Sequence, residues 1–369
     1  MTEESSTTSH LSVAMTTDDV DEAQTATGNT MTSSSSGDAQ FYFRCAVVIM
    51  GVVGTAGNAL VLYALIAAKQ HKKNPLIVNR NALDLFGSFF LVVSYATKLA
   101  NIRYIGALGY WLCITLHSEL FVTYGMYGSR FNIAAVTVER YLKVVHHVWS
   151  KNKLRPWMIN SAMAFCWLVG IVIATPVMLR SSGVRDVVCY YFECMSKGMQ
   201  LAVTIWYFMS FYVIIFAIFI FCYGRILVAI RRQARVMAAH SAAGSSTSQT
   251  HQSNQIQTNV IKTMILVSAF YVICHLPQAV LYSNAIVSSN LRVHYSTYYL
   301  SRIIQFLYVT ANPFIYALKF DPVKKVLKGM MPSRVTVWFN HCGVQCNSST
   351  VTVTTDRGNQ ELANTSVRE

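Results

Sequence analysis

Long apolar runs alternate with short polar stretches along most of this chain. Seven such runs lie at about residues 42–68, 75–98, 108–142, 156–179, 199–230, 258–287 and 296–318. A helix rises about 1.5 Å per residue, so each run is long enough to cross a hydrocarbon core of about 30 Å. The pattern therefore predicts seven membrane-spanning helices, two of which begin at the favourable prolines Pro75 and Pro156.

The distribution of charge predicts how these helices are oriented. The first forty residues contain no Lys or Arg, whereas "AKQHKKNP" after the first run and "SKNKLR" after the third are strongly basic. Basic loops stay on the cytoplasmic side, so the N-terminus is expected outside. The net charge of +14 then reflects membrane orientation, and no nucleic-acid partner is expected.

Composition agrees with a membrane protein and suggests four regions. The chain is 53% hydrophobic and only 12% charged, against roughly 25% charged in ordinary soluble domains. Residues 1–40 are rich in Ser, Thr and acids, and we expect a disordered extracellular tail. The spans occupy 41–319, an amphipathic helix follows at 320–330, and 331–369 form a cytoplasmic tail. The start "MTEESSTTSH" lacks the features of a cleavable signal peptide, so the first span is expected to direct insertion.

Polar residues inside the spans are functional hypotheses, because hydrocarbon tolerates few of them. They occur in a fixed order along the chain. The motifs are "GNALV" with Asn58 in the first span, "NRNALD" with Asn79 and Asp84 in the second, Cys113 and "ERY" (139–141) at the two ends of the third, Trp167 in the fourth, Tyr223 in the fifth, Cys274 and Pro277 in the sixth, and "NPFIY" (312–316) in the seventh.

Together these motifs resemble the rhodopsin-like, class A family of G-protein-coupled receptors, over roughly residues 41–330. The resemblance implies an all-α membrane protein, a seven-transmembrane helix bundle with a short amphipathic helix after the last span, in the plasma membrane. It implies a receptor that is no enzyme, needs no cofactor, binds an extracellular ligand and activates heterotrimeric G proteins through outward movement of the sixth helix. Arrestin and receptor kinases are the implied partners of the Ser/Thr-rich tail.

The resemblance also assigns roles to individual residues. Asp84 is expected to face Asn58 and Asn312, and Pro277 and Pro313 to leave bends that act as hinges. Arg140 is expected to leave its acidic neighbour on activation. The expected coupling and switch residues are Glu139, Arg140, Tyr141, Tyr223, Asn312, Pro313 and Tyr316, and the expected core relay and polar site comprises Asn58, Asp84, Ser129, Arg130, Tyr271, His275 and Pro277.

The relay beneath the expected ligand pocket departs from the family pattern. His275 stands where tryptophan is usual, Arg130 replaces an aliphatic residue and Tyr271 replaces phenylalanine. Unpaired polar groups are costly in a membrane core, so we hypothesise that these three form one hydrogen-bonded cluster. Asp84 would complete it, and a guanidinium would replace the sodium ion whose family site Ser129 matches. Signalling would then be insensitive to sodium.

Two departures affect the third span. Gln257 lies where many members carry an acidic partner for Arg140. Without that ion pair Arg140 is held more weakly, so we expect some signalling without ligand. Cys113 and Arg140 are twenty-seven residues apart, slightly more than the family pattern, which leaves residue matches in the outer third of that helix open.

The cysteines suggest one disulfide and two modification sites. By the resemblance, Cys113 pairs with a cysteine of the loop between the fourth and fifth spans, an oxidising location. Cys189 and Cys194 are both candidates, and we favour Cys189. Cys342 and Cys346 lie on the inner side and are candidates for palmitoylation.

The ligand is not identified by the sequence. The amine-binding position carries no acid, and Phe306 occupies the retinal-linking position. A basic residue near the outer end of the seventh span favours a carboxylate, and hence a peptide or a small acidic molecule. A membrane transporter or channel is the alternative, although the polar residues concentrate in the inner half of the bundle. The ligand-pocket candidates are Lys98, Glu119, Tyr282, Tyr298 and Arg302.

Overall fold

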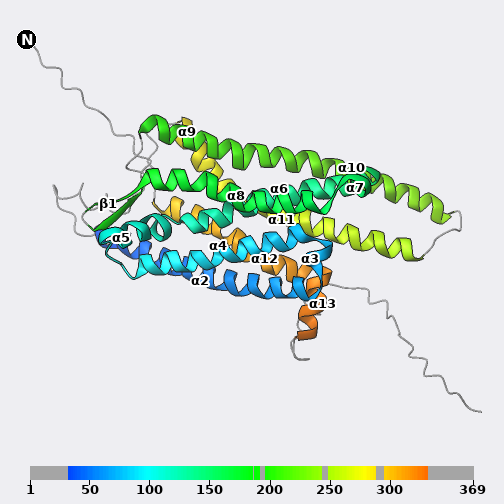
Figure 1. Cartoon of the computed structure of the whole chain (residues 1–369), viewed down its shortest axis with the longest axis horizontal. Coiled ribbons are helices and arrows are strands. Elements are labelled where there is room, and N and C mark those ends of the chain that lie inside the picture. The colour runs from blue at the N-terminus through cyan, green and yellow to red at the C-terminus, as the bar shows by residue number, and fades with distance from the viewer. Residues whose placement is uncertain (1–31, 186, 192–195, 243–247, 288–294, 331–369) are drawn as a thin grey trace, which may run out of the picture. The chain divides into compact units, whose positions relative to one another are not determined.

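Long helical segments run side by side through the molecule (Figure 1). The structure, a computed structural model, describes residues 32–185, 187–191, 196–242, 248–287 and 295–330. The segments belong to one unit that ends at Leu327. They are α2 (Thr32–Ala67), α4 (Pro75–Leu99), α6 (Leu120–Val145), α8 (Pro156–Ser181), α9 (Lys197–Phe208) continued by α10 (Ile214–Ala242), α11 (Ser248–Val287) and α12 (Tyr295–Lys319).

This arrangement confirms the seven-helix bundle expected from the apolar runs. Five of its helices, α2, α4, α8, α10 and α11, are long and apolar enough to span a membrane by length and composition alone. The helices α6 and α12 carry more polar side chains, which they turn into the bundle. Ser129 and Arg130 on α6 are each 1% exposed, and Asn312 on α12 is fully buried.

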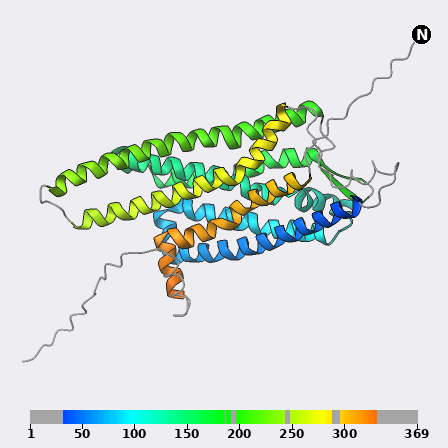
Figure 2. The ribbon, with the colours of Figure 1, turned by 180° about the vertical axis from the view of Figure 1, so that it is seen from behind.

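Short elements cap the two ends of the bundle. One end carries α5 (Gly106–Leu112) and an antiparallel hairpin, β1 (Ser182–Arg185) with β2 (Val188–Tyr191), in which Val184 pairs with Cys189. We call it the hairpin end. The opposite end carries α3 (Gln70–Lys73), α7 (His147–Lys153) and α13 (Asp321–Met330), and we call it the α13 end (Figures 1 and 2).

Two short π-helical stretches interrupt the third and fifth segments. The first, η1 (Cys113–His117), follows α5, and Glu119 then adopts a left-handed backbone (φ 62°) before α6 begins. The run predicted as one helix at 108–142 is therefore divided into three pieces. A π-helical turn takes up extra residues, which accounts for the long spacing between Cys113 and Arg140. The second stretch, η2 (Met209–Val213), precedes Ile215 in α10, where the family often has proline.

Glycines allow a close contact between two helices of the bundle. A Cβ atom built on Gly125 of α6 would lie 2.7 Å from the Cα of Gly87 on α4, so Gly125 has no room for a side chain. Small residues of this kind bring membrane helices together. The contact fixes α4 against α6 beside the polar core described below.

The helix α13 occupies the range of the expected amphipathic helix. The side chains of Phe320, Val323 and Leu327, expected on its apolar side, are all buried, and Lys325 is exposed. At the other terminus α2 begins at Thr32, ahead of the boundary expected at residue 41. The rest of the two expected tails, residues 1–31 and 331–369, lies outside the described residues.

Candidate functional site

Asp84 is the centre of a polar site inside the bundle. Its Oδ1 accepts a hydrogen bond from Ser129 Oγ at 2.6 Å, and its Oδ2 accepts one from Asn312 Nδ2 at 2.9 Å. The three residues come from α4, α6 and α12. A carboxylate that is 1% exposed needs such donors, because burying an unpaired charge is costly.

The guanidinium beside Asp84 belongs to Arg80, which corrects the expectation from the sequence. Arg80 lies one helical turn before Asp84, and its Nε is 3.6 Å from Asp84 Oδ2. Its Nη2 donates to the hydroxyl of Tyr308 on α12. Arg80 is fully buried and lies within "NRNALD", but the motif did not predict a role for it. The i, i+4 spacing to Asp84 was the signal that would have revealed it.

Arg130 lies in an aromatic environment. Its Nη1 donates to the hydroxyl of Tyr207 at 2.6 Å, and its guanidinium lies 5.6 Å from the centre of that ring and 5.8 Å from the ring of Tyr127. Ring faces and hydroxyl oxygens both stabilise a guanidinium away from water. The charge next to Asp84 is thus supplied by α4 and not, as expected, by α6.

The histidine before Pro277 is stacked among tyrosines. His275 Nδ1 lies 2.9 Å from the backbone carbonyl of Tyr271, and the two rings are 4.3 Å apart. Tyr308 completes the stack, with ring centres 5.1 Å from His275 and 5.3 Å from Tyr271. Because Tyr308 also accepts the hydrogen bond from Arg80, the stack on α11 is joined to the polar site on α4.

Asn58 makes different contacts from those expected. Its Nδ2 donates to the backbone carbonyl of Val309 at 3.3 Å, and its Oδ1 accepts from Asn81 Nδ2 at 3.0 Å. It therefore joins α2 to α4 and α12 without a hydrogen bond to Asp84 among the described contacts. In the same layer, Trp167 donates to Asn79 at 2.9 Å, which ties α8 to α4.

The expected switch arginine is held at the α13 end. Arg140 Nη2 donates to Asn74 Oδ1 and lies 3.6 Å from Glu139 Oε2. Glu139 also pairs with Lys143, with 2.6 Å between Nζ and Oε1. The side chain of Gln257 lies outside the described side chains. Tyr141, the last residue of "ERY", points elsewhere, its hydroxyl 3.0 Å from His146 Nε2.

Tyr223 joins three segments close to Arg140. Its hydroxyl lies 3.0 Å from Thr137 Oγ1 on α6 and 2.8 Å from Ser268 Oγ on α11. Tyr316, the last residue of "NPFIY", is fully buried, and its hydroxyl has no hydrogen-bond partner among the residues that the structure describes. These contacts place both expected switch tyrosines in the interior.

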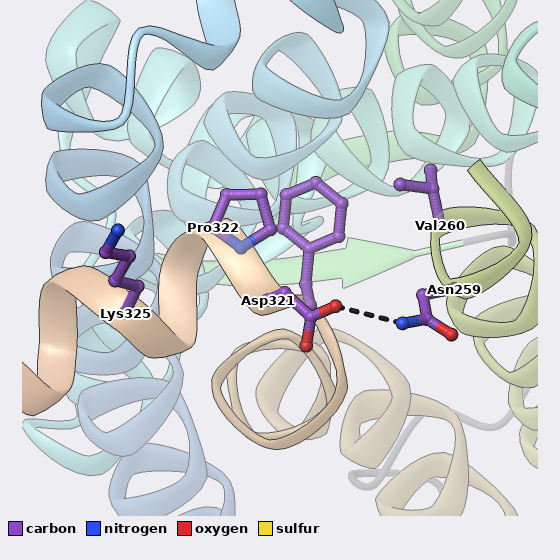
Figure 3. A pocket seen from close by; sticks show the side chains of 6 residues that line it. Asn259, Val260, Asp321, Pro322 and Lys325 are labelled. Atoms are coloured by element: carbon purple, nitrogen blue, oxygen red, sulfur yellow. Dashed lines mark hydrogen bonds between the residues drawn. The ribbon is translucent and has the colours of Figure 1, made fainter. Parts of the chain in front are cut away.

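A second set of contacts fastens α11 to the junction of α12 and α13, where α12 ends at Lys319 and α13 begins at Asp321. Asn259 Nδ2 donates to Asp321 Oδ2 at 3.1 Å, and Thr263 Oγ1 donates to the backbone carbonyl of Lys319 at 3.1 Å. We call these two hydrogen bonds the α11–α13 latch. A hollow of about 180 Å³ lies beside the latch. Figure 3 shows the hydrogen bond between Asn259 and Asp321 at this hollow. Its lining residues are Asn259, Val260, Phe320, Asp321, Pro322 and Lys325.

Three of the ligand-pocket candidates meet at the hairpin end. Glu119 Oε1 lies 2.6 Å from Lys98 Nζ, and Glu119 Oε2 lies 2.5 Å from Arg302 Nη2. Tyr298 is half-buried one turn before Arg302, and its backbone carbonyl accepts from Ser301. The side chain of Tyr282 lies outside the described side chains.

The hairpin is fastened to the third segment by a disulfide. Cys113 is bonded to Cys189, with Cα atoms 5.6 Å apart, so the favoured pairing is the one observed. The alternative Cys194 and the palmitoylation candidates Cys342 and Cys346 lie outside the described residues. In the loop before α5, the hydroxyl of Tyr104 lies 2.9 Å from a ring nitrogen of His117, and burial raises the pKa of this tyrosine.

Known proteins resemble this chain over most of its length. A family model described as "7 transmembrane receptor (rhodopsin family)" matches residues 57–316. The human galanin receptor type 2 is 26% identical over 274 residues, covering 72% of this chain and 67% of the receptor. Melanopsin-A of Gadus morhua is 26% identical over 301 residues, covering 78% of this chain and 52% of that protein. The structure of squid rhodopsin superimposes with a TM-score of 0.64 at 17% identity, covering 84% and 89% of the two chains.

The fold, the buried polar core and the "ERY" and "NPFIY" contacts define a seven-helix membrane receptor. The matched region is well over half of the chain, so the protein belongs to the rhodopsin family of G-protein-coupled receptors. It is a multi-pass membrane protein, and members of this family signal as receptors and not as enzymes.

Proposed function

We propose that the protein binds an extracellular ligand at the hairpin end and activates a heterotrimeric G protein at the α13 end. The observation that carries the proposal is the position of Arg140, buried against Asn74 and Glu139 where α11 closes the bundle. The basic residues of α3 and α7 lie at the same end, which supports a cytoplasmic location for it and an extracellular N-terminus.

Outward movement of α11 opens this end in the proposed mechanism. The movement separates Ser268 from Tyr223 and breaks the α11–α13 latch. Pro277 lies inside α11 and removes one backbone hydrogen bond, so the helix can bend there. Arg140, which Asn74 and Glu139 hold at this end of the bundle, then becomes accessible to the G protein.

The ligand class is a peptide or a small acidic molecule. The cations Lys98 and Arg302 at the hairpin end support it, because a guanidinium and an ammonium both bind carboxylates. Several similar proteins are galanin receptors, which makes a galanin-like molecule the first to test. Arrestin and receptor kinases are proposed to act on the tail at residues 331–369.

Nucleotide exchange on purified G proteins tests the proposal. The unmodified chain is compared with Arg140→Ala and with Lys151→Ala, which alters an exposed basic residue at the same end. Surface expression is matched, and a panel of G proteins is used with and without a galanin-like peptide. We expect exchange with at least one G protein, lost in Arg140→Ala and kept in Lys151→Ala. Absence of exchange throughout, together with solute flux across vesicles, would favour a transporter or channel.

A further inference from the structure

Three charged side chains from three segments converge at the hairpin end. Lys98 closes α4, Glu119 precedes α6 and Arg302 lies in the second turn of α12. The two oxygens of Glu119 are used separately, Oε1 by Lys98 at 2.6 Å and Oε2 by Arg302 at 2.5 Å. One carboxylate thus serves two cations.

The cluster carries more positive than negative charge. Arg44 of α2 adds a third cation, because its Nη1 donates to the backbone carbonyl of Lys98 at 2.9 Å. The surroundings therefore favour an additional or a replacement anion.

Aromatic rings hold the two cations in place. Lys98 Nζ lies 4.5 Å from the ring centre of Tyr95, and the Arg302 guanidinium lies 4.6 Å from that of Phe306. Arg302 Nη1 also donates to Gln305 at 3.0 Å. These contacts are independent of Glu119, so the cations stay oriented when that carboxylate is replaced.

The cluster is accessible, unlike the ion pair in the core. The side chains of Lys98, Glu119 and Arg302 are 13%, 12% and 19% exposed, whereas those of Arg80 and Asp84 are at most 1% exposed. An anion from outside can reach the cluster, and it meets cations that are partly removed from water. Electrostatic attraction is stronger there than in bulk water.

The backbone does not by itself favour glutamate at this position. Glu119 has φ 62° and ψ 32°, the left-handed region that suits glycine and asparagine, and it follows directly on the π-helical stretch η1. Its side chain makes two ion pairs, one with Lys98 and one with Arg302. The carboxylate of a ligand would make the same two ion pairs with Lys98 and Arg302.

We infer that Lys98 and Arg302 form a carboxylate-binding site, that Glu119 fills it when no ligand is bound, and that the carboxylate of the ligand replaces that of Glu119. The inference deepens the proposed function by naming the chemical group that the ligand must present. On binding, the ligand carboxylate takes over the link between α4 and α12, and Glu119, the residue before α6, is released from both.

Chemical rescue tests the site without any G protein. The full chain and its Glu119→Ala variant are purified in detergent, and thermal unfolding is followed with increasing sodium propionate, with propionamide and with sodium chloride at matched ionic strength. We expect Glu119→Ala to unfold at a lower temperature and propionate to restore the midpoint in a saturable way. Propionamide has the same shape without charge and should have no effect.

Two further variants complete the experiment. The double variant Glu119→Ala/Arg302→Gln should lose the rescue, because one of the two cations is gone. If Glu119→Ala does not fold, Glu119→Gln takes its place, and a midpoint shift with propionate at least twice that with propionamide is expected. Equal shifts with propionate and propionamide in the variant that folds would overturn the inference and make Glu119 a structural ion pair only. Failed G-protein exchange would instead overturn the proposed function, since rescue needs no G protein.

Discussion

Arg80 and Asp84 show at the residue scale how a charged pair is held inside the bundle. Both side chains are removed from water, and each has further partners, Tyr308 for the guanidinium and Ser129 and Asn312 for the carboxylate. Removing one member of a buried pair leaves an unpaired charge, which costs about 3–5 kcal/mol. Replacing both Arg80 and Asp84 with uncharged residues leaves no unpaired charge, so it costs much less.

Thermal unfolding of the purified chain should reveal this coupling. Arg80→Leu is expected to destabilise the protein by about 3 kcal/mol or more, and adding Asp84→Asn should recover most of the loss, because no buried charge then remains. Arg225→Leu replaces an exposed arginine of α10 and is the control, with little expected change. A single variant as stable as the parent would contradict the pairing.

The same pair predicts insensitivity to sodium. The guanidinium of Arg80 already supplies the positive charge beside Asp84. Nucleotide exchange by the unmodified chain should therefore be equal in sodium chloride and potassium chloride at the same ionic strength. Arg80→Leu should introduce a difference between the two salts. A sodium effect in the parent that disappears with Asp84→Asn would show that the ion, and not Arg80, occupies this place.

Only part of this site could be predicted from the sequence. Asp84, Ser129 and Asn312 were expected together from their motifs, and the structure joins them. The family motif is carried by the polar neighbours of Arg80, so the motif predicts no role for this residue. Only its i, i+4 spacing to Asp84 indicates an ion pair. Arg130 was expected next to Asp84 because a pattern along the chain does not show which side of a helix faces which neighbour.

At the scale of elements, the α11–α13 latch is the contact that the proposed opening of the α13 end must break. Its two hydrogen bonds connect residues about sixty positions apart. The hydrogen bond between Asn259 and Asp321 is exposed to solvent, so it contributes about 0.5–1.5 kcal/mol. Asn259 lies two residues after Gln257, whose position predicted a weak restraint on Arg140.

Breaking the latch should raise exchange without ligand. Asn259→Ala is expected to increase the basal rate several-fold, because the closed state loses a hydrogen bond that the open state lacks. Lys262→Ala alters an exposed residue of the same helix and serves as control. Joining the helices through Asn259→Cys with Asp321→Cys under oxidising conditions should reduce the rate, and reduction should restore it. An unchanged rate in Asn259→Ala would argue against the latch.

The disulfide between Cys113 and Cys189 fixes the hairpin over the third segment. Cys189→Ser should destabilise the protein by about 2–5 kcal/mol and lower surface expression, because it removes a disulfide between residues 76 positions apart. Cys194→Ser is the matched control within the same loop, and a small effect is expected. Peptide mapping by mass spectrometry checks the pairing directly, and a Cys113–Cys194 bridge would contradict it.

Hydrophobic pattern was sufficient for the seven spans but not for their irregularities. Apolar runs locate a helix because a membrane requires satisfied backbone hydrogen bonds over a fixed length. The π-helical stretches η1 and η2 alter the backbone without altering the apolar pattern, so only the unusual distance between Cys113 and Arg140 hinted at the first. The latch left no signal, since neither Asn259 nor Asp321 belongs to a motif.

For the whole molecule, polar contacts lie at three levels between the hairpin end and the α13 end. The cluster of Lys98, Glu119 and Arg302 lies at the first, the pair of Arg80 and Asp84 at the second, and Arg140 with its neighbours at the third. The stack of Tyr271, His275 and Tyr308 connects α11 to the middle level. Movement of α11 must therefore rearrange contacts on α12 and α4.

The measurement that tests the account most directly is the distance between spin labels on α3 and α11. Lys73 and Lys262 are exposed and lie at the ends that should separate, so Lys73→Cys and Lys262→Cys, in a background without other reactive cysteines, carry the labels. We predict one short distance for the isolated protein and a second, longer population when a nucleotide-free G protein is bound, absent in Arg140→Ala. An unchanged distribution in the presence of a G protein whose nucleotide exchange is accelerated would contradict outward movement of α11.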